Sequence, residues 1–280
     1  MHVRIVADST ADVEAAVKSR LTVVPLTVHF GDEEYTDGVT ITHRQFYEKL
    51  IESDVLPTTS QPTPDAFAQV FQEAADAGDS VVVITISAKL SGTCQSASIA
   101  AADFPGRVFV VDSHSATIGT GILVERALEL ADSGMDAAGI AQQLSREREN
   151  IRLIAMLDTL EYLKRGGRIS KTVAFAGGVL SIKPVINVQD GEIHILGKAR
   201  GSKQGNNLLV KEIQAAGGID FDRPILLGYT GLSDLLLQKY IQDSTALWQN
   251  GTGSLPTTAI GSVIGTHAGP GAIAAAFFKK

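Results

Sequence analysis

The chain has little cysteine and no excess of positive charge. Among its 280 residues there is one cysteine, Cys94, which excludes an internal disulfide and any zinc or iron–sulfur site built from several cysteines. Lysine and arginine number 24 against 31 aspartates and glutamates, so the formal net charge is −7. Nucleic acids bind basic surfaces, so we expect no nucleic acid among the partners of this acidic chain.

Long apolar runs and nucleotide-binding fingerprints are also missing. No run of about 18 apolar residues occurs, so we expect no integral membrane segment. The first residues, Met1–Asp8, are typical of a strand and not of a signal peptide, which favours a cytoplasmic protein. Neither a Walker A loop nor a Gly-x-Gly-x-x-Gly sequence is present, which argues against nucleotide binding by these modes. The histidines are scattered without metal-ligand spacing, so no metal site is expected.

Hydrophobic residues make up 44% of the chain, which is enough for a sizeable core. In the first half, continuous apolar runs at Val3–Ala7, Ser80–Ile86 and Val108–Val111 alternate with segments of helical spacing. Strands buried on both faces have such sequences, so this half predicts a parallel sheet with helices on both faces. We also expect a helix over Ala11–Ser19 and, because of its proline, an irregular or edge strand over Leu21–Phe30.

The second half has a different pattern. Ile182–Val188 and Glu192–Leu196 flank a turn sequence and predict a hairpin, and a helix is expected over Leu232–Leu247. The chain therefore predicts an α/β fold of two domains. Residues 1–150 would hold the parallel sheet, and residues 151–280 would form an α+β domain with a mostly antiparallel sheet.

Small hydroxyl residues follow three of the predicted strands. They are Asp8-Ser9-Thr10, the loop Ser87–Thr93 and Asp112-Ser113. In open α/β sheets, ligands bind outside the carboxyl ends of the strands, so this recurrence favours a shared site. Helix capping also explains each loop, since serine, threonine and aspartate are the common capping residues.

Two loops are suited to binding an anion. Leu90-Ser91-Gly92-Thr93 leads into a helix, where free backbone N–H groups and the helix dipole favour negative charge. Thr58-Thr59-Ser60-Gln61-Pro62 is a second hydroxyl-rich loop before a helix, although a plain turn has the same composition. Neither loop contains an arginine, and Lys89 is the only basic residue nearby. A phosphate dianion usually has cationic partners, so the loops favour a carboxylate.

His267 lies in a glycine-rich turn near the end of the sequence, where it could donate to an anion or simply be solvated. Ser91, His267 and an aspartate (Asp8 or Asp112) could instead form the triad of a Ser-dependent acyl hydrolase or esterase. The Gly-x-Ser-x-Gly sequence of one such class is absent, so this alternative is the weaker one. Cys94 is expected to be a small core residue and not a nucleophile.

A basic cluster surrounds Gly166-Gly167 and consists of Lys164, Arg165, Arg168 and Lys171. Cations suit the C-terminus of a helix, which explains the cluster structurally. A docking face for an acidic or phosphate-bearing partner is the alternative.

Taken together, these motifs resemble the DegV family of bacterial fatty-acid-binding proteins. The matching pieces extend almost from one end of the chain to the other, and their order and spacing are more specific than any one of them. The pieces are Asp8-Ser9-Thr10, Thr59-Ser60-Gln61-Pro62, Leu90-Ser91-Gly92-Thr93, Asp112-Ser113, Gly166-Gly167-Arg168-Ile169, Lys183-Pro184 and His267-Ala268-Gly269-Pro270-Gly271.

The resemblance implies a long-chain fatty acid buried between the two domains, with its carboxylate held by Thr59, Ser91, the Gly92 amide and His267. It implies no cofactor and no turnover by the protein itself. The fatty acid would be presented to a separate ATP-dependent fatty acid kinase, which makes an acyl phosphate for phospholipid synthesis. Arg168 would belong to the surface that meets this kinase. Further residues expected to line the site are Ser60, Gln61, Thr93 and Ser113.

The resemblance leaves the tail pocket open. Phe67–Phe71 and Val173–Leu180 are candidates to line it, and each is equally well explained as ordinary core. Cys94 departs from the family pattern, in which an aromatic residue often follows Ser-Gly-Thr. A long acyl chain has about 15 methylenes, each worth about 0.8 kcal/mol on burial. A buried carboxylate is costly unless it is hydrogen-bonded, and hydroxyls, an amide and an imidazole can supply those bonds.

Overall fold

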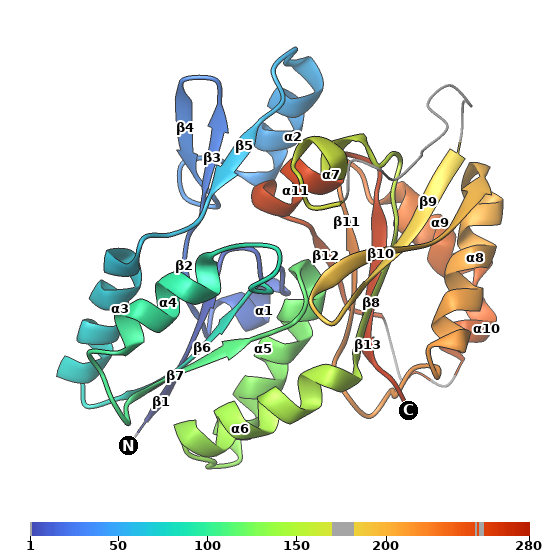
Figure 1. Cartoon of the computed structure of the whole chain (residues 1–280). Helices are drawn as coiled ribbons and strands as arrows, with labels where there is room; N and C mark the ends of the chain where they lie inside the picture. The colour runs from blue at the N-terminus through green and yellow to red at the C-terminus, as the bar shows by residue number, and fades with distance from the viewer. Residues whose placement is uncertain (1, 170–181, 250, 252–254) are drawn as a thin grey trace.

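The computed structural model describes residues 2–169, 182–249, 251 and 255–280, and their strands form three sheets (Figure 1). The first is a parallel sheet of four strands in the order β2-β1-β6-β7. Alternate residues of β1 and β6 pack on opposite faces, which explains their continuous apolar sequences. These strands are β1 (Val3–Asp8), β2 (Thr22–Val24), β6 (Ser80–Thr85) and β7 (Val108–Asp112).

Helices cover both faces of the parallel sheet, as the sequence predicts. Phe67 and Phe71 of α3 pack with α4 against one face, and α5 and α6 pack against the other. Thr63 caps α3 by accepting a hydrogen bond from the N–H of Ala66, and Pro64 occupies the first helical turn. The helices are α3 (Pro64–Asp76), α4 (Thr93–Ala101), α5 (Thr117–Asp132) and α6 (Ala137–Glu147).

The second sheet has the order β10-β9-β8-β13-β11-β12 and is antiparallel except for the β11–β12 pair. This confirms the mostly antiparallel sheet. One face shares a core with α5, which therefore lies between the two large sheets (Figure 1). Its strands are β8 (Ile151–Met156), β9 (Ile182–Gln189), β10 (Glu192–Arg200), β11 (Ile225–Tyr229), β12 (Thr257–Ala259) and β13 (Ile273–Phe278).

The other face of the second sheet is covered by α8, α9 and α10. The sequence did not predict α8, and the helix expected over Leu232–Leu247 is divided into α9 and α10 at Ser244, whose φ of −114° is not helical. The bounds are α8 (Gly201–Ala215), α9 (Leu235–Asp243) and α10 (Thr245–Trp248). Strand β8 begins at residue 151, and the division of the chain into two domains stays a prediction.

A third, antiparallel sheet has the order β4-β3-β5 and packs with α2 and α11. Its presence corrects the single strand expected over Leu21–Phe30. The backbone breaks at Pro25, so that β2 joins the parallel sheet and β3 joins this one. The elements are β3 (Thr27–Phe30), β4 (Glu33–Thr36), β5 (Thr58–Ser60), α2 (His43–Glu52) and α11 (Ser262–Ala268).

The short elements complete the description. The helix expected over Ala11–Ser19 is reduced to α1, and Asp12, which precedes it, is hydrogen-bonded through its side chain to Thr117 and to the N–H of Gly261. None of the helices within the described ranges is both long and apolar enough to cross a bilayer. The remaining short elements are α1 (Ala15–Lys18), a 3-10 turn at Arg148–Asn150 and α7 (Glu161–Arg165).

Candidate ligand-binding site

A largely apolar cavity lies where the loop after β6, the second sheet and α11 meet. The loop after β6 contributes Ile86 and Leu90, and α11 contributes Val263 and Ile264. The strands of the second sheet contribute Leu153, Ala155, Ile186, Val188, Ile193 and Ala274.

Polar side chains from four separate segments line the same cavity. Thr59 comes from β5, Ser91 from the loop before α4, Arg168 from the segment after α7 and His267 from α11. Thr59 Oγ1 and His267 Nε2 are 3.0 Å apart, and Ser91 Oγ lies 2.9 Å from Thr93 Oγ1. Three of the four residues predicted to hold a carboxylate therefore line one cavity. The sequence places Thr59 in a loop and His267 in a turn, but Thr59 is on a strand and His267 is in a helix. The reason is that β5 pairs with β3 and α11 packs against the third sheet.

Burial determines the charge of His267. Burial, with a smaller contribution from the nearby Arg168 guanidinium, lowers the pKa of the imidazole to about 4. His267 is therefore neutral at pH 7. Its Nδ1 atom is buried and has no hydrogen-bond partner among the described residues. A Cβ at Gly166 would lie 2.2 Å from this atom, so the first glycine of the pair after α7 allows the close approach.

Arg168 brings a positive charge to a site that seemed to lack one in the sequence. Its Nε donates to the carbonyl oxygen of Leu90 at 3.1 Å, and its Nη1 donates to that of Gly166 at 2.6 Å. The cation thus lies beside the Leu90–Ser91 loop although it comes from a distant segment. The role of Arg168 in docking a partner stays a prediction, and Lys171 lies outside the described residues.

The other predicted site residues do not line this cavity. A Cβ at Gly92 would lie 2.1 Å from Gln61 Oε1, and Gln61 Nε2 donates to Ser96 Oγ at 3.0 Å. Gln61 therefore fastens the end of β5 to the start of α4. Ser60 Oγ lies 2.9 Å from His29 Nε2, away from the cavity. Gly92 is the N-cap of α4, and Thr93 is the first residue of that helix. Ser113 is buried, and its hydroxyl is hydrogen-bonded to Ser115 and Thr120.

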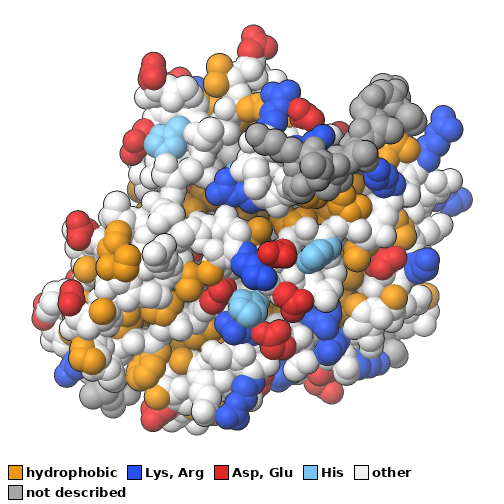
Figure 2. Space-filling model, in the orientation of Figure 1, with side chains coloured by type: hydrophobic (Ala, Val, Ile, Leu, Met, Phe, Trp, Pro, Cys, Tyr) orange, Lys and Arg blue, Asp and Glu red, His pale blue; other side chains and the backbone are white. Residues whose placement is uncertain are grey.

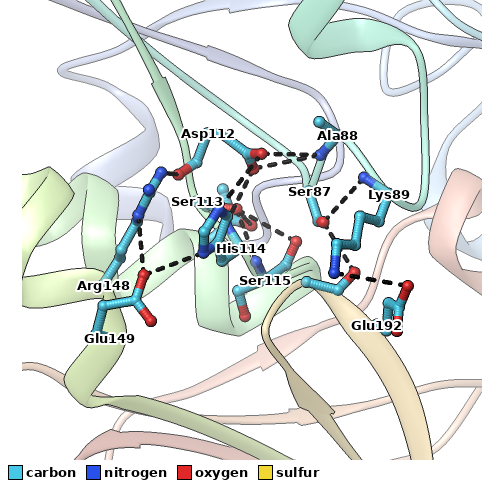
Figure 3. Close-up of polar contacts among 12 residues, drawn as sticks. Ser87, Ala88, Lys89, Asp112, Ser113, His114, Ser115, Arg148, Glu149 and Glu192 are labelled. Carbon is cyan, nitrogen blue, oxygen red and sulfur yellow. Dashed lines mark hydrogen bonds and ion pairs between the residues drawn. The ribbon is translucent and has the colours of Figure 1, made fainter.

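The sequence favours one site shared by the three strand ends, but in the structure they do not converge. Asp8 is buried and accepts hydrogen bonds from the N–H groups of Thr10 and Ile86. Asp112 accepts from Ala88 N and belongs to a separate network with His114, drawn in Figure 3. Figure 2, in the orientation of Figure 1, shows charged and histidine side chains gathered near the centre of the face in view. Capping and loop-fixing thus account for two of the three loops.

The walls of the cavity differ from the two segments named as candidates for the tail pocket. Phe67 and Phe71 pack in the core on the opposite face of the parallel sheet, so the ordinary-core alternative holds for them and not the pocket. Val173–Leu180 lies outside the described residues. The walls come instead from alternate residues of strands, such as Leu153 with Ala155 and Ile186 with Val188. A period of two marks one face of a strand, but the sequence does not show which face meets the ligand.

The geometry does not favour a hydrolase. Ser91 Oγ is paired with Thr93, and His267 Nε2 is paired with Thr59. Within the described ranges no carboxylate is bonded to His267 Nδ1, so the third member of a triad is not in place. Burial raises the pKa of the Cys94 thiol, which disfavours the reactive thiolate.

Comparison with known proteins identifies the family. The model of the DegV family, described as uncharacterised proteins, matches residues 2–280. A DegV domain-containing protein of Deinococcus radiodurans is 37% identical over 282 residues, which covers 99% of this chain and 98% of the relative. The chain belongs to the DegV family. The resemblance drawn from the motifs is thereby confirmed.

Solved structures of DegV proteins share this fold. A DegV family protein from Thermus thermophilus, described by its fatty acid binding, matches with a TM-score of 0.88 and 35% identity, covering 99% of this chain and 100% of that one. A stearic-acid-binding protein from Eubacterium ventriosum matches with a TM-score of 0.87 and 28% identity, covering 100% and 99%. These matches confirm the mixed α/β fold.

Proposed function

We propose that this DegV protein binds one long-chain fatty acid in the cavity beside α11. The observation that carries the proposal is a largely apolar cavity with Thr59, Ser91 and His267 on its wall. Two relatives of the same fold bind fatty acids, one of them stearic acid. An apolar chain with one polar end matches the chemistry of this lining, which is mostly apolar with a few polar side chains.

The carboxylate would lie at the polar wall. Thr59 and Ser91, which line the cavity, are its proposed donors, together with a proton on Nε2 of neutral His267. The N–H of Gly92 is a further proposed donor because it follows Ser91 at the start of α4, although Gly92 itself does not line the cavity. Arg168 adds a nearby positive charge without leaving the hydrogen bonds that hold it. These donors replace the water that a buried carboxylate loses. The roughly 15 methylenes of the tail, at about 0.8 kcal/mol each, supply the main driving force.

The protein would act as a carrier without turnover of its own. It would present the fatty acid to a separate kinase, which forms an acyl phosphate used in phospholipid synthesis. The absence of a bonded carboxylate at His267 within the described residues supports this role over hydrolysis, because the imidazole is not set up as a general base.

The first test is the content of the purified protein. Organic extraction and mass spectrometry should find one fatty acid per chain, or the emptied protein should take up added palmitate or oleate. A protein that stays empty and binds neither acid would overturn the proposal. Hydrolysis of an acyl ester that disappears in Ser91→Ala would instead support the esterase.

The second test removes single donors. Thr59→Val and Ser91→Ala should each weaken palmitate binding about tenfold or more, because an unpaired buried carboxylate oxygen costs roughly 1–3 kcal/mol. Thr58→Val and Ser98→Ala are matched controls, since Thr58 is exposed on the same strand and Ser98 Oγ bonds only within α4. Equal losses in the controls would show that the assay reports general instability.

A further inference from the structure

Two buried carboxylates lie at the N-terminal end of α11, in a second cavity away from the proposed ligand. Asp12 accepts a hydrogen bond from the N–H of Gly261 at 2.8 Å. Asp37 accepts from the backbone and the side chain of Ser262. The first two residues at the start of α11 are therefore fixed by acids from the N-terminal part of the chain.

Asp12 also holds the start of α5. Its second oxygen accepts a hydrogen bond from Thr117 Oγ1 at 2.6 Å. Thr117 has a φ of +46°, a left-handed conformation that is strained for a threonine. Thr117 also lines the ligand cavity. The Asp12 carboxylate is therefore bonded at the starts of α5 and α11, and both helices contribute to the wall of that cavity.

The helix that Asp12 holds carries the proposed carboxylate ligand at its other end. Helix α11 has seven residues, and His267 lies in its last turn, where Nε2 meets Thr59 Oγ1. A shift or rotation at Gly261 is transmitted through so short a helix to the imidazole. Val263 and Ile264, which line the cavity, lie between the two ends.

We propose that Asp12 is a positioning residue of the ligand site, which sets the imidazole of His267 against Thr59 by fixing the start of α11. This inference rests on the proposed function. It explains why a carboxylate is buried here at a cost in stability, where an apolar side chain would fill the space more cheaply. Asp37 fixes the same helix end through Ser262 and supports Asp12 in this role.

Three variants separate positioning from charge. Asp12→Asn keeps an oxygen for Gly261 and can donate to Thr117, so palmitate affinity should stay within about threefold of wild type. Asp12→Ala removes both bonds, and affinity should fall about tenfold or more. Asp136→Ala is the control, because Asp136 also accepts from a backbone N–H at a helix start, at 2.8 Å from Gly139 N, and does not line the cavity.

The decisive readout is the imidazole itself. The nitrogen resonances of His267 in the empty protein, assigned by their loss in His267→Gln, should move in Asp12→Ala but not in Asp12→Asn or Asp136→Ala. This measurement needs no ligand, so it distinguishes failure of the positioning role from failure of fatty-acid binding. If the His267 resonances do not move in a folded Asp12→Ala protein, the proposal is overturned. It is also overturned if Asp12→Asn moves them as much as Asp12→Ala does. If Asp12→Ala does not fold, Asp12→Glu lengthens the side chain by one methylene and must move the same resonances.

Discussion

At the scale of single residues, the proposed site relies on neutral donors and on one cation held by the backbone. His267 is neutral because burial lowers its pKa to about 4. A neutral imidazole carries one proton and can donate it from Nε2 without the cost of a second buried charge. The Arg168 guanidinium is held by two carbonyl oxygens, of Leu90 and Gly166. The positive charge is therefore fixed beside the cavity before any ligand arrives.

The protonation of His267 can be measured in the empty protein. A pKa near 4 means that its imidazole signals should not titrate between pH 8 and pH 5.5. The measurement is an NMR titration of wild type against His267→Gln. In Arg168→Gln, the loss of the neighbouring cation should raise the pKa, because that charge opposes protonation. A wild-type midpoint above pH 6 would contradict the neutral-donor role.

The buried carboxyl of Asp12 predicts a pH dependence of stability. Burial raises its pKa from 3.8 to about 7, although bonds from Thr117 and Gly261 oppose the rise. Because the folded state holds the proton more tightly, the contribution of Asp12 to stability is complete below about pH 4 and is lost as the pH rises to about 7. Asp12→Asn has no such loss. Its free energy of unfolding relative to wild type should increase by roughly 2–3 kcal/mol from pH 5 to pH 8.

Urea unfolding at the two pH values tests this prediction, with Asp136→Asn as the exposed control. If the difference in free energy of unfolding between Asp12→Asn and wild type does not change with pH, the Asp12 carboxyl has the same pKa in the folded and unfolded states.

At the scale of elements, the β9–β10 hairpin is fastened to the loop after β6. Ser87 Oγ donates to the carbonyl oxygen of Gly191 at 2.8 Å, in the network drawn in Figure 3. Lys89 and Glu192 form an exposed ion pair at 3.6 Å, which contributes little. The same hairpin supplies Ile186, Val188 and Ile193 to the cavity, so this contact closes one wall.

Gly191→Ala tests that contact against a matched glycine. Gly191 has a φ of +79°, and a Cβ there would lie 2.4 Å from Ser87 Oγ. Gly78 has a φ of +77° and nothing within 4 Å, so Gly78→Ala isolates the conformational cost of roughly 1–2 kcal/mol. We expect Gly191→Ala to cost more and to release bound palmitate faster, as measured by thermal unfolding and by stopped-flow transfer to an acceptor. Equal effects of the two substitutions would mean that the hairpin contact does not close the wall.

The same scale shows what the sequence could predict. Helix α3 follows from Thr63, Pro64 and the residues after them, because capping is a local interaction. The parallel strands follow from their apolar runs. The pairing of β5 with β3 and the approach of Arg168 to Leu90 depend on contacts 31 and 78 residues apart, for which the sequence has no local signal. Thr59, Ser91 and His267 could be placed together only through the family resemblance.

At the scale of the whole molecule, an acidic protein carries basic residues beside the proposed ligand. The net charge is −7, yet Lys164 and Arg165 at the end of α7 are close in the chain to Arg168, which lines the cavity. In the proposed function the carboxylate must become accessible to the kinase before it can be phosphorylated, so we expect the partner to act close to Arg168. Arg165 is exposed and forms an ion pair with Glu161, whereas Arg168 is half-buried and lines the cavity. The two arginines are therefore expected to differ in what they do.

A reconstituted assay with the kinase and ATP separates their roles. Arg165→Ala should leave the fatty-acid content unchanged and slow acyl-phosphate formation, because an exposed cation steers the encounter with a partner. The wild-type rate should fall with added salt, since exposed charges are screened within about 10 Å at 0.1 M. Arg168→Ala should reduce both the rate and the bound lipid, because its side chain also supports the Leu90–Ser91 loop. Bound lipid that is unchanged in Arg168→Ala, together with a slower rate, would instead assign Arg168 to the docking surface alone.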